Sequence, residues 1–184
     1  MKKITSALLL LAVFAAPAMA AEPGRFYGSI DLGRWNMKDS NFPDPGVFVV
    51  TGGFQIAPQF AVELGLYGAG ESVVYYPGSG SQIANQSAFT AAAVGTLPIN
   101  ERFQLFGKLG ASFITAKITG TGAYAGTYTK ETTTNAVVGL GGQINFTKRF
   151  GMRLQYEALG KSKASPTDPG VDVTVSSIGL TYNF

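Results

Sequence analysis

Five charged residues stand out in this sequence because each lies inside a stretch of otherwise apolar, small or neutral polar residues. They are three carboxylates and two cations: Asp31, Glu63, Lys108, Arg153 and Glu157. An ionised side chain enclosed in a protein interior is costly unless a group of opposite charge compensates it. The residue types therefore predict a network of ion pairs, and the sequence leaves open which carboxylate pairs with which cation.

The composition excludes most catalytic chemistry. The 184 residues contain neither Cys nor His, which removes Cys/His zinc sites, thiol nucleophiles, disulfides and Ser-His relays. Glu63 and Glu157 could form a glycosidase-like pair. However, the basic residues among them favour ionised carboxylates, and the narrow barrel predicted from the strands leaves no cleft for a sugar chain. A Ser-Lys dyad stays formally open, but no hydroxyl and lysine stand out. We predict no enzymatic activity, no cofactor and no metal site.

The first residues have the pattern of a secretory signal. Lys2 and Lys3 form a positive n-region, an apolar run follows from Ala7 to Ala16, and Ala18-Met19-Ala20 fits the A-x-A cleavage rule. An N-terminal membrane anchor is the alternative, but the run is about half of the ~20 residues that span a bilayer. We predict a signal peptide at 1–20 and a mature domain at 21–184.

The mature chain carries little charge. Charged residues make up 14% of the sequence, against roughly 25% in soluble domains. Cleavage would remove Lys2 and Lys3 from 14 basic residues and leave a net charge of about +1 against 11 acidic residues. No cluster of basic residues with interleaved aromatics is present, so we predict no nucleic-acid partner.

Large aliphatic residues alternate with small or polar residues along much of the mature chain. At 60–67, Val62, Leu64 and Leu66 share one face while Glu63 lies on the other, and residues 150–157 repeat the pattern. This period of two predicts strands. We place eight of them, at 25–36, 46–57, 60–74, 87–98, 102–118, 130–146, 149–161 and 172–184.

The connections between these strands alternate in length. Pro58-Gln59, Ile99-Asn100-Glu101 and Thr147-Lys148 are tight turns. The other connections are longer and polar, at 38–45, 75–86, 119–129 and 162–171. Short turns at one end and long loops at the other are typical of a transmembrane β-barrel, whose sheet must close because lipid offers no hydrogen-bond partners. We predict an all-β fold, an eight-stranded antiparallel up-and-down transmembrane β-barrel.

A soluble lipocalin-like barrel in the periplasm, with its apolar faces around an apolar ligand, is the main structural alternative. Alternation alone does not decide between the two orientations. The signal peptide, the low charge and the aromatic C-terminus favour apolar faces toward lipid, which turns the five charged residues into the lumen. Aromatic girdles at the rims are then assigned to Trp35, Tyr67, Tyr156, Tyr182 and Phe184, although Tyr67 has the inward phase.

The last predicted strand changes phase along its length. Val171, Val173 and Val175 have one parity, and the apolar residues from Ile178 to Phe184 have the other. Either a β-bulge near Ser176-Ser177 reconciles them, or the valines pack inward and leave Asp172 exposed.

Two segments resemble the outer membrane protein A-like and opacity-protein-like group of small outer-membrane barrels. They are Leu97 to Gly110, a strand, tight turn and strand ending in Lys-Leu-Gly, and Val175 to Phe184. The resemblance implies the bacterial outer membrane, with its lipids and lipopolysaccharide as partners. Tyr182 and Phe184 resemble the C-terminal signal read by the barrel assembly machinery. The sequence ends at the eighth strand, so anchoring to the cell wall is not implied.

These expectations favour a non-enzymatic outer-membrane protein of a Gram-negative bacterium. Its barrel would contribute to envelope integrity or to surface contact, with the loops facing a host or cell-surface ligand. The alternative is a small porin-like channel gated by Glu63, Lys108, Arg153 and Glu157. The third candidate is the soluble periplasmic binding barrel.

Overall fold

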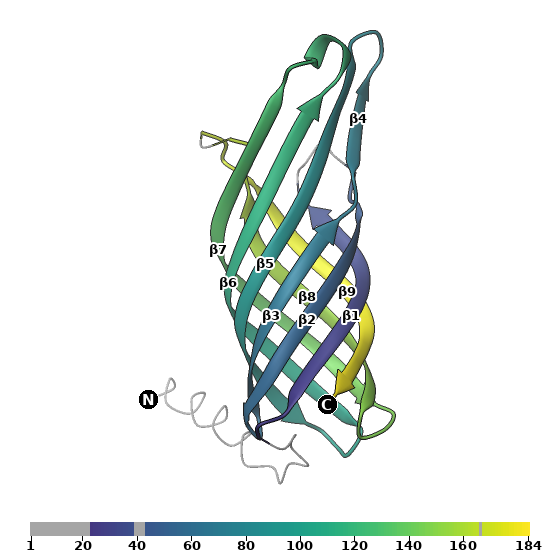
Figure 1. The fold of residues 1–184 in the computed structure, drawn as a ribbon, viewed down its shortest axis with the longest axis vertical. Helices are drawn as coiled ribbons and strands as arrows, with labels where there is room; N and C mark the ends of the chain where they lie inside the picture. The colour runs from purple at the N-terminus through teal and green to yellow at the C-terminus, as the bar shows by residue number, and fades with distance from the viewer. Residues whose placement is uncertain (1–22, 39–42, 166) are drawn as a thin grey trace, which may run out of the picture.

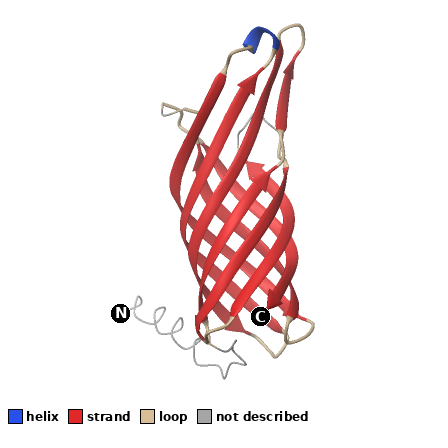
Figure 2. Cartoon of the chain, in the orientation of Figure 1, coloured by secondary structure: helices blue, strands red, loops and turns tan. Residues whose placement is uncertain are grey.

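The computed structural model describes residues 23–38, 43–165 and 167–184, and within these ranges the chain is almost entirely β-strand (Figures 1 and 2). The strands are β1 Phe26–Met37, β2 Gly46–Ala57, β3 Phe60–Ala69, β4 Ser72–Tyr76, β5 Gly80–Pro98, β6 Phe103–Gly120, β7 Tyr128–Asn145, β8 Phe150–Ser162 and β9 Val171–Asn183. A single 3-10 turn in these ranges, η2, spans Gly122–Tyr124. None of the described helices is long and apolar enough to cross a membrane. The predicted signal peptide at 1–20 lies outside the described residues.

The strands form one closed antiparallel sheet. Its order is β3-β2-β1-β9-β8-β7-β6-β5-β4, and an additional pairing of β3 with β5 closes the barrel. β4 continues the path of β3 after an interruption at Gly70 and Glu71, so β3 and β4 together occupy the position of one predicted strand. The predicted eight-stranded antiparallel barrel is confirmed.

Side chains alternate between the two faces of the barrel wall as predicted. Leu64 and Leu154 are 51% and 62% exposed on the outside, whereas their neighbours Glu63 and Arg153 are 4% and 2% exposed. The aliphatic residues therefore form the outer surface and the charged residues face the lumen. The soluble barrel with an apolar ligand site, which needs the reverse orientation, is contradicted.

At one end of the barrel the strands extend further than was predicted. Three short turns, at 58–59, 99–102 and 146–149, mark the turn end of the barrel, and the longer connections mark the loop end. At the loop end the segment 75–86, predicted as a loop, is largely strand, whereas β6 and β7 each extend only two residues into the predicted loop 119–129. We call this region the outer sheet, which consists of β4 with residues 80–86, 116–120 and 128–131 (Figure 1). It lies beyond the last pairing of β3 with β5. The Gly and Ser residues of 75–86 indicated a loop because strands beyond the closed barrel need no continuous apolar face.

The phase change in the last strand has a simple cause. Val173 and Val175 are 1% and 0% exposed in the lumen, while Ile178 and Leu180 lie outside. The register of β8 and β9 shifts only between Ala158 and Gly160 on β8, so the predicted bulge near Ser176-Ser177 is wrong. The alternative, in which the valines pack inward and Asp172 is exposed, is confirmed.

Candidate functional site

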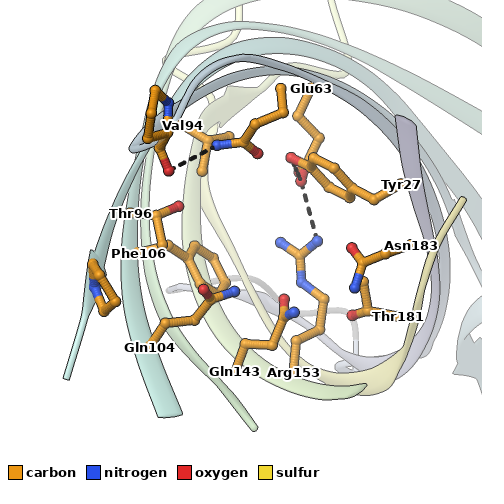
Figure 3. Close-up of a pocket in the computed structure, with 13 residues that line it drawn as sticks. Tyr27, Glu63, Val94, Thr96, Gln104, Phe106, Gln143, Arg153, Thr181 and Asn183 are labelled. Atoms are coloured by element: carbon orange, nitrogen blue, oxygen red, sulfur yellow. Dashed lines mark hydrogen bonds and ion pairs between the residues drawn. The ribbon is translucent and has the colours of Figure 1, made fainter. Parts of the chain in front are cut away.

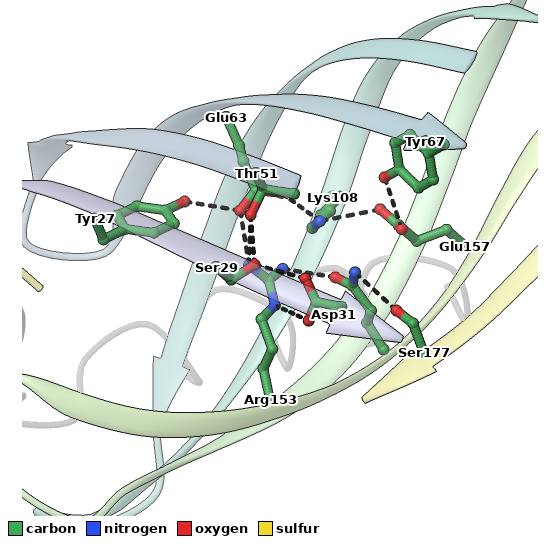
Figure 4. A network of polar contacts seen from close by, with 11 residues as sticks. Tyr27, Ser29, Asp31, Thr51, Glu63, Tyr67, Lys108, Arg153, Glu157 and Ser177 are labelled. Atoms are coloured by element: carbon green, nitrogen blue, oxygen red, sulfur yellow. Dashed lines mark hydrogen bonds and ion pairs between the residues drawn. The ribbon is translucent and has the colours of Figure 1, made fainter. Parts of the chain in front are cut away.

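The lumen brings together all five charged residues singled out in the sequence. They come from β1, β3, β6 and β8 and are between 0% and 4% exposed: Asp31, Glu63, Lys108, Arg153 and Glu157 (Figure 4). No group of three or more His, Cys, Asp and Glu side chains in the described ranges is arranged to hold a metal ion. The site is therefore an ion-pair network, and its pairings can be read directly.

Lys108 lies between two carboxylates. Its ammonium forms an ion pair with Glu63 Oε1 and another with Glu157 Oε1, at 3.0 Å. The second oxygen of Glu157 accepts a hydrogen bond of 2.8 Å from the Tyr67 hydroxyl. Lys108 thus links β6 to both β3 and β8 across the lumen.

Arg153 holds the other side of the network. Its Nη1 lies 3.1 Å from Glu63 Oε2, its Nη2 donates to Gln155 Oε1 at 2.6 Å, and its guanidinium carbon lies 4.7 Å from the centre of the Phe106 ring. Tyr27 also donates to Glu63 Oε2, at 3.0 Å. Glu63 is consequently the central acceptor, because both cations and a tyrosine meet on its two oxygens.

Asp31 is the least compensated member. Its Oδ2 accepts a hydrogen bond of 2.6 Å from Ser29, whereas its Oδ1 is 4.0 Å from Arg153 Nε. Both of those facing atoms are buried without a hydrogen-bond partner among the described residues. The network holds three carboxylates and only two cations, so Asp31 carries the surplus acidic group.

Glycines on the inner face make these contacts geometrically possible. In three places a glycine lies on the strand between two interacting side chains and on the same rung of the sheet. The three sets are Arg153–Gly179–Asp31, Lys108–Gly139–Glu157 and Tyr27–Gly53–Glu63. A Cβ at Gly139 would lie 2.8 Å from Glu157 Cγ, and one at Gly179 would collide with the Asp31 carboxylate. Each glycine thus leaves space in the lumen for the side chains of its two cross-strand neighbours to contact each other.

An apolar layer fills the lumen on the loop-end side of the network. Its most enclosed members, each at most 1% exposed, are Trp35, Val49, Ile114, Val137, Leu159, Val173 and Val175. The indole Nε1 of Trp35 donates to Gln86 Oε1 at 2.9 Å. The prediction that Trp35 lies in a rim girdle is therefore wrong. Tyr67 also lies in the lumen, whereas Tyr156 faces outward and is 48% exposed.

Polar side chains line the lumen on the opposite side of the network. A cavity of about 50 Å³ lies beside Arg153 and Glu63 (Figure 3), and a wider mouth of about 520 Å³ opens at the turn end. The residues that line both are Tyr27, Gln55, Gln104, Gln143 and Asn183. We call this region the vestibule. The lumen therefore has three layers: the vestibule, the ion-pair network and the apolar layer.

The C-terminal aromatics lie at the turn end. Tyr182 packs against Phe150 and Phe184, with ring centres 4.9 Å apart in each case, and Phe184 is 71% exposed. The Phe184 amide donates to Phe26 O at 3.0 Å. This placement leaves the terminal side chain accessible, and its role in assembly remains a prediction.

Comparison with known proteins identifies the family. A family model described as "Outer membrane protein beta-barrel domain" matches residues 6–184. A search of curated proteins gave no match.

Several solved structures share the fold. Neisserial surface protein A (NspA) has a TM-score of 0.68 at 14% identity, covering 86% of this chain and 97% of that one. Ail, the attachment invasion locus protein of Yersinia pestis, in complex with the heparin analogue sucrose octasulfate, has a TM-score of 0.64 at 20% identity, covering 89% and 100%. OprG from Pseudomonas aeruginosa has a TM-score of 0.59 at 14% identity, covering 90% and 98%. At these identities the likeness concerns the fold.

The closed barrel with its lipid-facing aliphatic surface agrees with the family match over nearly the whole sequence. The chain belongs to the outer membrane protein β-barrel domain family and is a protein of the bacterial outer membrane.

Proposed function

We propose that this protein is a non-enzymatic surface-contact protein, in which a barrel with a closed lumen carries the outer sheet as its binding element. The loop end, and with it the outer sheet, then faces the cell exterior. The observation that carries this proposal is the free edge of β7. Its pairing with β8 begins only at Val138, so residues 128–137 pair with β6 alone within the described chain.

The backbone of this edge is available for pairing. The Asn145 amide donates to Arg102 on the β6 side. Because amides alternate in direction along a strand, those of Tyr128 and Lys130 point away from β6, toward the part of the free edge that lies beyond the last β3 pairing. An exposed edge of this kind can accept an extended segment of another protein by β-augmentation.

The lumen supports a role at the surface. The apolar layer and the ion-pair network fill its loop-end half, and an eight-stranded barrel is only wide enough for its own side chains. A contact made by the outer sheet therefore needs no passage through the barrel. Among proteins of the same fold, Ail was crystallised with a heparin analogue, which supports a surface ligand for this chain as well.

Attachment of bacteria tests the proposal. Cells of a non-adherent strain that express the wild type are expected to bind cultured epithelial monolayers more strongly than cells with an empty vector. Lys130→Pro is expected to reduce this attachment severalfold, since proline removes an edge amide without removing a bond to β6. Lys130→Val loses the same charge but keeps the amide, and serves as the matched control.

The comparison requires equal amounts of the wild-type and variant proteins in the outer membrane. Wild-type attachment no greater than that of the vector control would overturn the proposed function. Inhibition by soluble heparin, together with equal attachment by Lys130→Pro and Lys130→Val, would replace strand pairing with a contact to a charged glycan.

The second candidate function is a small gated channel, and the vestibule favours it. Polar side chains line the lumen from the turn end as far as Arg153 and Glu63. If the network is the gate, Lys108→Met changes the conductance of the reconstituted protein. The surface-contact proposal predicts no conductance for either protein, because the apolar layer remains in place.

A further inference from the structure

The outward face of β5, β6 and β7 changes character in steps toward the loop end. Successive rungs across the three strands, two residues apart, are Ala91, Ala111 and Ala136; then Phe89, Phe113 and Thr134; then Ser87, Thr115 and Thr132; then Asn85, Lys117 and Lys130. Over these four rungs the series runs from small apolar residues to aromatic rings, hydroxyls and ammonium groups, and the next rung consists of Ile83, Thr119 and Tyr128. This order matches the change from acyl chains to headgroups across one leaflet of a membrane.

The lysine rung is not neutralised by the protein itself. Lys117 and Lys130 lie directly opposite each other on β6 and β7, an arrangement that is unfavourable for two like charges. The ion pairs of the described residues include neither of them. Glu131 follows Lys130 in the strand and so points to the other face. The Lys117 ammonium lies 5.5 Å from the Tyr128 ring centre. This cation–π contact stabilises the position of the ammonium group but does not neutralise its charge.

Hydroxyl groups adjoin the two ammonium groups. Thr115 and Thr132 occupy the rung below and share a hydrogen bond of 2.9 Å between their Oγ1 atoms. Two cations beside two hydroxyls are the donors that a phosphate group needs.

A groove on the same outer face begins beside this rung. It has a volume of about 460 Å³ and crosses β2, β3, β5 and β6. Its outward-facing lining is Phe48, Val50, Leu66, Gly68, Ser87, Phe89, Phe113 and Thr115. Gly68 opens its floor, because a Cβ there would meet no atom within 4 Å. The groove is thus apolar below and bounded by Ser87 and Thr115 at its upper end.

The height of the lysine rung fits the surface of the bilayer. Ser87 pairs with Gly68 close to the end of β3, whereas Asn85, in the lysine rung, lies beyond the last β3 pairing. The closed barrel therefore ends at the level where the basic rung begins. Most of the aliphatic outer surface lies below this rung, and Val73 and Ile83 lie one rung above it.

We propose that this groove and the lysine rung together bind one phosphorylated lipid of the outer leaflet, with an acyl chain against Gly68 and the phosphate between Lys117 and Lys130. The continuity of the groove with the lipid-facing surface favours a membrane lipid over a free anion. The site lies outside the lumen and does not depend on the proposed surface contact.

Native mass spectrometry of the full-length mature protein in detergent tests the site. The probe is dimyristoyl phosphatidic acid, compared with dimyristoylglycerol, which has the same chains without phosphate, and with inorganic phosphate alone. We expect a one-to-one complex with phosphatidic acid that is on the order of tenfold or more tighter than that with dimyristoylglycerol, since the phosphate contacts are charge-assisted.

Two independent variants separate the parts of the site. Lys117→Ser with Lys130→Ser removes the phosphate contacts, and Gly68→Leu fills the groove. Each is expected to weaken phosphatidic acid binding at least about tenfold. The matched controls are Lys148→Ser, which removes a lysine at the turn end, and Gly52→Leu, which adds the same side chain at another outward glycine with open space around it. Both controls are expected to bind as the wild type does.

Three results would overturn the proposal. Equal binding of phosphatidic acid and dimyristoylglycerol would show that the phosphate is not recognised. Full competition by inorganic phosphate at equal concentration would replace the lipid with a free anion. Unchanged binding by the double lysine variant or by Gly68→Leu, with the heat-dependent gel shift of a folded barrel retained, would place the lipid elsewhere.

Discussion

Three inward glycines hold open the space in which the ion-pair network forms. Gly53, Gly139 and Gly179 each lie between two side chains that meet over them. The network is therefore a property of neighbouring rungs, and a single added methyl group can disturb it.

Gly179→Ala is expected to lower the free energy of unfolding by about 1–3 kcal/mol, because the new Cβ overpacks against the Asp31 carboxylate and the backbone. Urea unfolding of the reconstituted barrel measures this. Gly52→Ala is the control, since a Cβ at Gly52 meets no atom within 4 Å. Equal stability of the two variants would show that Gly179 does not limit the packing of the network.

Lys108→Met is expected to destabilise the barrel by roughly 3–5 kcal/mol, because it leaves the buried carboxylates of Glu63 and Glu157 short of a cation. Adding Glu157→Gln to this variant removes one of the two carboxylates and should recover a large part of the loss. The same unfolding measurement on both variants provides the check. A double variant less stable than Lys108→Met would contradict the pairing.

The inward position of the five charged residues was predictable, because alternation is local and the phase of each strand can be read from a few neighbours. The pairings were not, since they depend on the rungs that closure of the barrel aligns. Trp35 was misplaced because an apolar lumen layer has the same composition as a lipid-facing surface.

At the level of elements, the outer sheet is where the structure departs most from the expectation. Residues 75–86 were predicted as a loop, yet β4 and β5 occupy most of this segment, whereas the predicted loop 119–129 is strand only at its first two and last two residues. Composition distinguishes strands from loops inside a membrane, where one face must be apolar. Above the membrane this constraint ends, and polar residues occur both in paired strands and in loops.

The free edge of β7 predicts an alternating pattern of amide hydrogen exchange. The amides of Thr129 and Glu131 point toward β6 and are expected to exchange slowly, whereas those of Tyr128 and Lys130 have no partner strand among the described residues and should exchange rapidly. NMR exchange measurements on the reconstituted protein resolve each amide. Equal protection of Lys130 and Glu131 would show that the edge is covered.

For the whole molecule, the order of the three lumen layers matters more than any single contact. The vestibule opens at the turn end, the network ties four strands together, and the apolar layer lies between the network and the loop end. A barrel built in this way gives the outer sheet a rigid base. Closure of the lumen therefore distinguishes the two candidate functions, because a channel needs an open path through the barrel and a surface-contact protein does not.

Recording from the purified protein in planar lipid bilayers tests this closure most directly. We predict no conductance steps for the wild type, and steps for Trp35→Ala combined with Leu159→Ala, because truncating two fully buried side chains opens the apolar layer. Steps in the wild type that change size with Lys108→Met would contradict the account and identify the ion-pair network as a gate.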